Sequence, residues 1–213
     1  AVLTYYVPVF TISWGGILLV VGPGFSLDST AIPQERLPFV YLAMLIGPSV
    51  AGILATGLVA GGAGLRQLLS RFVRWRVGGR WYAVALLTPP ILLMAVLLAL
   101  SLFSRAFLPA IFTADDKASL LLTGLAVGLL VGFCEELGWT GFAIPRLRQH
   151  YGILTTGLIV GLLWGAWHFL VFWESNTFST AFGLALLLAR LFSWLPPYRV
   201  FMVWVYDQTG SLL

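Results

Sequence analysis

The stretch ASLLLTGLAVGLLVGFCEELGWTGFAIP, residues 118–145, is long and apolar enough to cross a bilayer as a helix. Glu135 and Glu136 are the only charged residues in it. An ionised carboxylate at bilayer depth is costly unless it is paired, hydrated or protonated. The adjacent acids therefore indicate a polar site inside a membrane protein.

The composition indicates the same class of protein. Of 213 residues, 60% are hydrophobic and only 9% are charged, which lies outside the range of soluble domains. Pro196 and Pro197 interrupt the last of six apolar stretches, where they either kink one helix or separate two. We therefore expect an all-α, polytopic transmembrane bundle of six or seven helices, in one domain over residues 1–213. Besides residues 118–145, the stretches are residues 1–27, 37–65, 81–104, 151–173 and 175–206, the last of these containing the two prolines.

One connection concentrates the positive charge of the chain. It holds five arginines and no acid, so the positive-inside rule places it in the cytoplasm, with the N-terminus on the same side. Asp28 and Asp115 then lie across the membrane. Apolar residues recur at helical spacing between the arginines, so we expect residues 65–80 to form an interfacial segment that binds membrane lipid and not nucleic acid. The arginines are Arg66, Arg71, Arg74, Arg76 and Arg80.

Two glycine ladders suggest how the acids and a histidine could meet. Glycine recurs at every fourth residue over 124–132 and over 157–165, and small residues at this spacing let transmembrane helices approach closely. Glu135 and His168 each follow a ladder by three residues, so we expect these two side chains to be neighbours and Glu136 to face another partner. Along their helices Glu135 lies about 16 Å from Arg146 and His168 about 26 Å from Tyr151, a depth mismatch of about 10 Å.

Three kinds of chemistry suit this set of residues. A buried carboxylate can act as general base toward water, and an imidazole can orient that water or stabilise an oxyanion. Two acids and a histidine could instead bind a divalent metal such as zinc, or form the proton relay of a transporter. Glu135-Glu136 is not the His-Glu-x-x-His signature, so the metal hypothesis rests on composition alone.

The residues also resemble a known family. The segment EELGWTGF at 135–142, with PRL at 145–147, is similar to the first motif of the CAAX-protease and bacteriocin-processing family of intramembrane endopeptidases. The segment WGAWH at 164–168 resembles its second motif. The resemblance covers roughly residues 37–173, and the basic run is similar to that of bacterial members, which implies a bacterial plasma membrane.

The resemblance implies an all-helical membrane fold of about eight helices that hydrolyses peptide bonds near the cytoplasmic side. Carried over by residue, Glu135 would be the general base, Glu136 the second acid of the pair, and His168 the second-motif histidine. We expect a mechanism without a cofactor, and a divalent metal such as zinc stays the alternative. The expected substrate-pocket residues are Trp139, Trp164 and Trp167.

Two departures from the family pattern bear on activity. The first motif usually has an arginine four residues after its second acid, where this chain has Thr140. Glu136 thus lacks an i, i+4 ion pair, so another group must compensate its charge or it must be protonated. A later helix with a histidine and an asparagine is also expected. Because residues 211–213 read as the start of another apolar segment, we expect the sequence to be a fragment.

The leading hypothesis is an intramembrane endopeptidase that cuts a membrane-associated peptide or a prenylated protein. Thr140 and the absent last motif motivate the alternative, an inactive member that serves as a membrane scaffold or as an accessory subunit of a larger complex. A proton-coupled transporter is the third hypothesis, and the lack of a visible inverted repeat counts against it.

Overall fold

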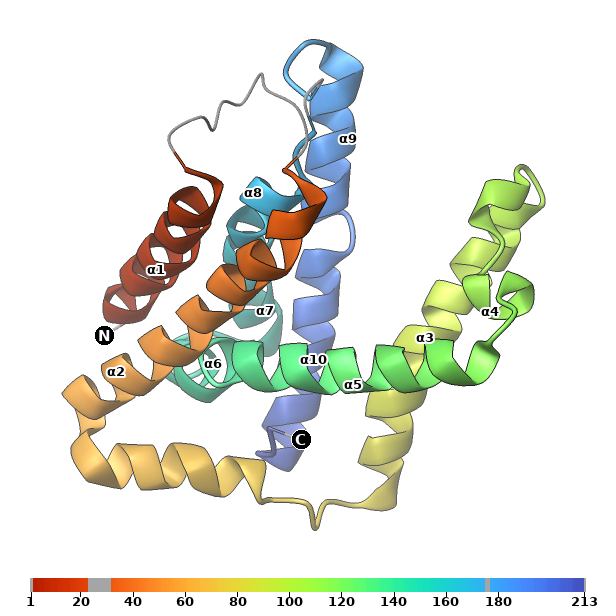
Figure 1. The fold of residues 1–213 in the computed structure, drawn as a ribbon. Coiled ribbons are helices and arrows are strands. Elements are labelled where there is room, and N and C mark those ends of the chain that lie inside the picture. Colours follow the sequence, from red (N-terminus) through yellow and green to blue (C-terminus); the bar gives the residue numbers. More distant parts are fainter. Residues whose placement is uncertain (1, 23–31, 175–176, 213) are drawn as a thin grey trace. The chain divides into compact units, whose positions relative to one another are not determined.

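The structure is a computed structural model that describes residues 2–22, 32–174 and 177–212. Asp28 therefore lies outside the described residues. Contacts divide the chain into two compact units, residues 1–75 with 134–213, and residues 76–133. The first unit contains α1 (Leu3–Val21), η1 (Gln34–Arg36), α2 (Leu37–Phe72), the π-helical turn η3 (Trp139–Ala143), α6 (Ile144–Leu147), α7 (Ile153–Trp167), α8 (Phe169–Phe172), α9 (Ala181–Phe192) and α10 (Leu195–Thr209) (Figure 1). The second contains α3 (Gly79–Ser101), η2 (Arg105–Phe107), α4 (Ala110–Thr113) and most of α5 (Lys117–Glu136).

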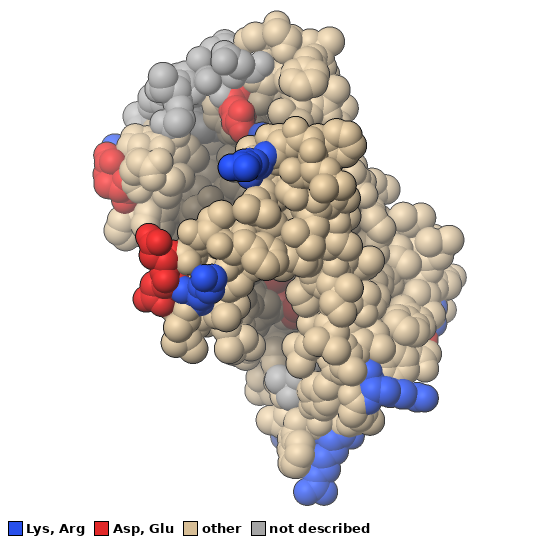
Figure 2. All heavy atoms as spheres, turned by 90° about the vertical axis from the view of Figure 1, so that its right-hand side faces the viewer, with Lys and Arg blue, Asp and Glu red and all other residues tan. Residues whose placement is uncertain are grey.

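Several helical segments have the length and composition of membrane spans, which confirms an all-helical, multi-pass membrane protein. The predicted stretch at residues 151–173 forms the shorter helices α7 and α8 instead. Large apolar side chains are exposed along α3, where Leu86 is 67% and Leu92 is 61% exposed, as expected of a surface that faces lipid. On the face shown in Figure 2, charged side chains are few. The spans are Leu3–Val21, Gln34–Phe72, Gly79–Ser101, Lys117–Leu147 and Ala181–Thr209.

The proline pair separates two helices. Helix α9 ends at Phe192, and α10 begins at Leu195, so Pro196 and Pro197 lie in the first turn of α10. Proline is favoured there because its missing N–H would have no partner inside the helix. Of the two alternatives that the sequence left open, the structure has the second, with only residues 193–194 between the helices.

Helix α2 bends sharply at Gly61, which the sequence had not led us to expect. Gly61 has φ 58° and ψ −158°, a backbone conformation that favours glycine because it has no Cβ. Figure 1 shows the helix changing direction there. The part after the bend contains the start of the predicted basic segment, and Arg71 in it donates a hydrogen bond to the Gly141 carbonyl at 2.9 Å. This part of the segment is helical as predicted, and its place in the membrane interface stays a prediction.

The second glycine ladder packs on α10. A Cβ atom added at Gly157 would collide with the backbone of Val200, and one at Gly161 with the backbone of Pro196. The prediction that this ladder faces the helix of the acids was therefore wrong. Its small residues specify a close approach, and α10 is the helix that makes it. Within residues 76–133, Cβ atoms added to the glycines of 124–132 would meet no atom within 4 Å.

Candidate active site

The two acids lie at the end of α5, where the helix gives way to a wider turn. After Glu136 the chain turns and continues as η3, and the amides of Phe142 and Ala143 both donate to the Gly138 carbonyl at 3.0 Å. π-helical turns occur frequently at functional sites. Glycine is required on both sides of the contact with α2, because a Cβ atom at Gly52 would lie 2.7 Å from Gly138 Cα. This close approach fixes the backbone that follows the acids.

Arg199 of α10 is the cation of the site. Its side chain is fully buried, and its Nη1 lies 2.8 Å from Oε2 of Glu136. Its Nη2 lies 3.7 Å from Oε2 of Glu135. The Thr140 hydroxyl donates to the same Glu136 oxygen, and Arg199 Nη1 is 3.4 Å from Thr140 Oγ1. The structure thus gives Glu136 the compensating charge that the sequence required and could not locate.

Two indole rings flank this guanidinium. Arg199 Cζ lies 4.1 Å from the ring centroid of Trp164 and 5.9 Å from that of Trp139. Aromatic faces attract cations, and arginine tolerates such surroundings because its delocalised charge is weakly hydrated. Two carboxylates and two indoles therefore lie around a cation that is 0% exposed.

Trp164 connects Glu135 and His168, two of the predicted catalytic residues. Its indole Nε1 donates to Oε2 of Glu135 at 2.7 Å, and its backbone carbonyl lies 2.8 Å from Nδ1 of His168. Because a carbonyl can only accept, Nδ1 carries the hydrogen, and Nε2 of the neutral ring keeps its lone pair. Glu135 and His168 thus share one neighbour, and no hydrogen bond joins them directly within the described part of the chain.

The other two predicted pocket residues lie in the core. Trp139 and Trp167 are both 0% exposed, and their ring centroids are 5.8 Å apart. Trp139 also packs on Tyr5, and the Trp167 carbonyl accepts a hydrogen bond from Trp14 Nε1 at 3.0 Å. These two rings pack on each other in the core. Their contact with a substrate stays a prediction.

Arg199 is not among the predicted site residues, although the sequence carries a signal for it. Arg199 is a charged residue inside an apolar stretch, which is the criterion that selected Glu135 and Glu136. No comparable signal marked Tyr5, whose ring packs 5.4 Å from that of Phe142. An aromatic residue in a transmembrane helix is ordinary, so its place beside the motif depends on how α1 folds back.

The arrangement of charges bears on the metal alternative. Among the residues that the structure describes, no three His, Cys, Asp or Glu side chains gather as a metal site would require. Arg199 instead contacts both carboxylates of the pair. A divalent cation would have to displace this guanidinium or accept its repulsion at short range.

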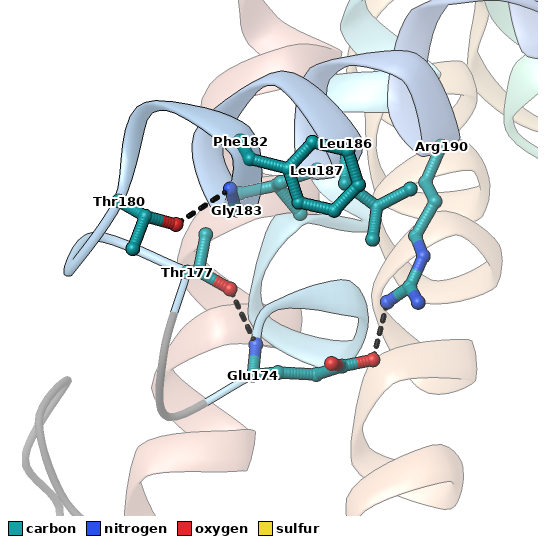
Figure 3. Close-up of a pocket in the computed structure, with 8 residues that line it drawn as sticks. All are labelled: Glu174, Thr177, Thr180, Phe182, Gly183, Leu186, Leu187 and Arg190. Carbon is teal, nitrogen blue, oxygen red and sulfur yellow. Dashed lines mark hydrogen bonds and ion pairs between the residues drawn. The ribbon is translucent and has the colours of Figure 1, made fainter.

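A cavity of about 200 Å³ lies elsewhere, between the end of α8 and the start of α9 (Figure 3). Its polar groups are paired with one another. Glu174 forms an ion pair with Arg190, and the hydroxyl of Thr177 accepts a hydrogen bond from the Glu174 amide at 2.8 Å. None of the predicted site residues lines this cavity, so we do not assign it to the site.

The fold and site define a multi-pass helical membrane protein with a buried centre of two carboxylates and one arginine. Residues 117–213, which include Glu135, Glu136 and Arg199, match the family model described as type II CAAX prenyl endopeptidase Rce1-like. The chain is also 25% identical over 191 residues to CAAX prenyl protease 2 of Methanococcus maripaludis, an alignment that covers 82% of this chain. These matches confirm the resemblance to the CAAX-protease family. The chain spans 64% of the length of that relative.

Proposed function

We propose that this chain is an intramembrane endopeptidase in which Glu135 is the general base. One observation carries the proposal. Oε2 of Glu135 accepts the Trp164 indole N–H and faces Arg199, whereas Oε1 receives no hydrogen bond from the described residues. One carboxylate oxygen is thus fixed, and the other is left to bind a water. A carboxylate held in this way can take a proton from that water.

The proposed reaction is a general-base hydrolysis. Glu135 Oε1 accepts a proton from the bound water as the water oxygen attacks the carbonyl carbon of the peptide. His168 accepts the second water hydrogen at Nε2 and so orients the attack. The carbon–nitrogen bond then breaks, and Glu135 returns its proton to the departing amine. No metal is needed, because Glu135 and His168 perform the proton transfer and orientation.

The hydrophobic character of the chain supports a substrate class. The acids end a segment that is long and apolar enough to cross a membrane, and large apolar side chains are exposed on the helices. The proposed substrate therefore approaches from within or beside the bilayer. We propose a membrane-associated peptide or a prenylated protein as substrate, and a bacterial plasma membrane with a cytoplasmic N-terminus as the setting.

The proposal is tested with the natural protein reconstituted in vesicles with a lipid-anchored peptide substrate. We expect Glu135→Gln and His168→Ala to abolish cleavage while the protein still inserts. The matched control is Glu174→Gln, which removes an exposed acid at the other cavity and should leave turnover unchanged. Undiminished turnover by Glu135→Gln would refute the general-base role.

An inactive membrane scaffold or accessory subunit is the second candidate, and Thr140 and the absent last motif motivated it. In the structure Arg199 supplies the charge whose absence motivated that hypothesis. The two candidates differ in one measurement. A scaffold would show no turnover in the unaltered protein, and its association with a partner would survive Glu135→Gln.

A further inference from the structure

We propose that Arg199 is the positioning residue of this site and that it performs from α10 the task that an arginine at position 140 would perform from η3. The proposal rests on the proposed function, because it assigns Arg199 to the orientation of Glu135. Arg199 touches no reacting atom in this scheme. It acts through Glu136 and Trp164.

The two positions reach the same atom. Thr140 Oγ1 and Arg199 Nη1 both contact Oε2 of Glu136, the first as a neighbour one helical turn away and the second from another helix. They also lie within 3.4 Å of each other. Positions 140 and 199 are therefore two routes by which a cation can be delivered to one carboxylate.

The packing of α10 on α7 delivers the cation. Gly161 lies so close to α10 that an added Cβ atom would be 3.2 Å from Arg199 Cβ. Trp164 follows Gly161 by three residues and lies on the same side of α7. Its ring therefore lies beside the guanidinium of Arg199. The glycine therefore sets both the depth of Arg199 and the contact with Trp164.

Arg199 thereby controls the orientation of Glu135. Its guanidinium packs on the Trp164 ring, and the Nε1 of that ring holds Oε2 of Glu135. The 3.7 Å separation between Arg199 Nη2 and Oε2 of Glu135 is an ion pair without a hydrogen bond. Loss of Arg199 would free the indole and leave two neighbouring carboxylates without their shared cation. Misplacement of a catalytic group by about 1 Å costs about 100-fold in rate.

The test moves the charge from one helix to the other. We expect Arg199→Met to lower kcat about 100-fold with little change in KM. Adding Thr140→Arg to that variant should restore at least a tenth of the original kcat, because the new cation reaches the same carboxylate. Arg199→Lys keeps the charge and lacks the planar guanidinium. Its kcat should therefore lie between those of Arg199→Met and the double variant. Arg190→Met, which removes an arginine on α9 at the exposed ion pair with Glu174, is the control and should retain kcat.

Two results would overturn the proposal. One is an Arg199→Met protein with undiminished kcat. The other is a folded double variant, shown by size-exclusion elution and thermal unfolding in detergent, that recovers no activity. If Arg199→Met does not fold, the double variant and Arg199→Lys still decide the matter.

A failure of the proposed function gives a different pattern. The unaltered protein and all variants would then be inactive. The unfolding temperature becomes the readout in that case. If Thr140→Arg restores the unfolding temperature that Arg199→Met lowers, positions 140 and 199 serve the same carboxylate. If the unfolding temperature is not restored, the proposal is overturned.

Discussion

Arg199 and Glu136 are 63 residues apart in the sequence, and their side chains form a 2.8 Å hydrogen-bonded ion pair in the interior of the protein. The pair ties the end of α5 to the middle of α10. Loss of Arg199 would leave Glu136 and the neighbouring Glu135 without their shared cation, which is costly in the interior of a protein. The geometry leads to predictions that separate the roles of individual contacts.

Trp164→Phe should reduce turnover while leaving the fold intact. The substitution keeps an aromatic face for Arg199 and removes the indole donor to Glu135. A hydrogen bond to a charged group contributes about 1.5–3 kcal/mol, so we expect kcat to fall by about 10- to 100-fold. The measurement is the rate of cleavage of a lipid-anchored peptide at saturating substrate.

The control for this substitution is Trp14→Phe. It also removes an indole hydrogen bond, the one that Trp14 donates to the Trp167 carbonyl, away from the acids. We expect it to lower stability slightly and to leave kcat unchanged. Equal losses of kcat in the two variants would mean that the Trp164 bond has no special role.

Gly161→Ala should destabilise the protein. The added Cβ atom collides with the backbone of Pro196, which cannot move aside as a flexible side chain could. Overpacking of this kind costs about 1–3 kcal/mol, and we expect a lower unfolding temperature in detergent. Gly15→Ala in α1 is the matched control, because nothing lies within 4 Å of its added Cβ atom. Identical unfolding temperatures would contradict the tight contact between α7 and α10.

Arg71→Leu should loosen the turn that follows the acids. The Arg71 guanidinium donates to the Gly141 carbonyl at 2.9 Å, and its loss removes that hydrogen bond from η3. We expect a loss of stability of about 1 kcal/mol, measured by unfolding in detergent. Arg66→Leu removes the same charge from an exposed position and should leave the stability unchanged. If both variants lose stability equally, the arginines act only through charge.

Labelling of single cysteines checks the predicted orientation. In a Cys134→Ser background, we expect Arg66→Cys to react with a membrane-impermeant maleimide only from the cytoplasmic side. Asp115→Cys should react only from the opposite side. Reversed labelling would show that the basic segment faces away from the cytoplasm.

The class of the protein and its first motif could be predicted because a charge in an apolar stretch is costly in any fold. Glu135, Glu136 and His168 stand out by that rule alone. Arg199 meets the same rule, yet its connection to Glu136 depends on which helix packs against α7. A glycine ladder predicts a close approach and does not name the neighbour, so the ladder ending at Gly165 was assigned to the wrong helix.

The bend at Gly61 was missed for a related reason. Glycine is frequent in transmembrane helices, so the pair at Gly61 and Gly62 did not by itself mark a bend. The contact between Arg71 and Gly141 depends on that bend. Sequence patterns therefore predicted most of the long apolar helices, and the contacts between elements that are distant in the chain came only from the structure.

Position 140 has a consequence for how related chains are compared. An arginine on η3 or on α10 can neutralise Glu136. In related sequences the arginine can therefore stand at either position while the net charge around the acids stays the same. The absence of an arginine at position 140 is then no sign that a related chain is inactive. The quantity to compare is the total charge that surrounds the paired acids in three dimensions.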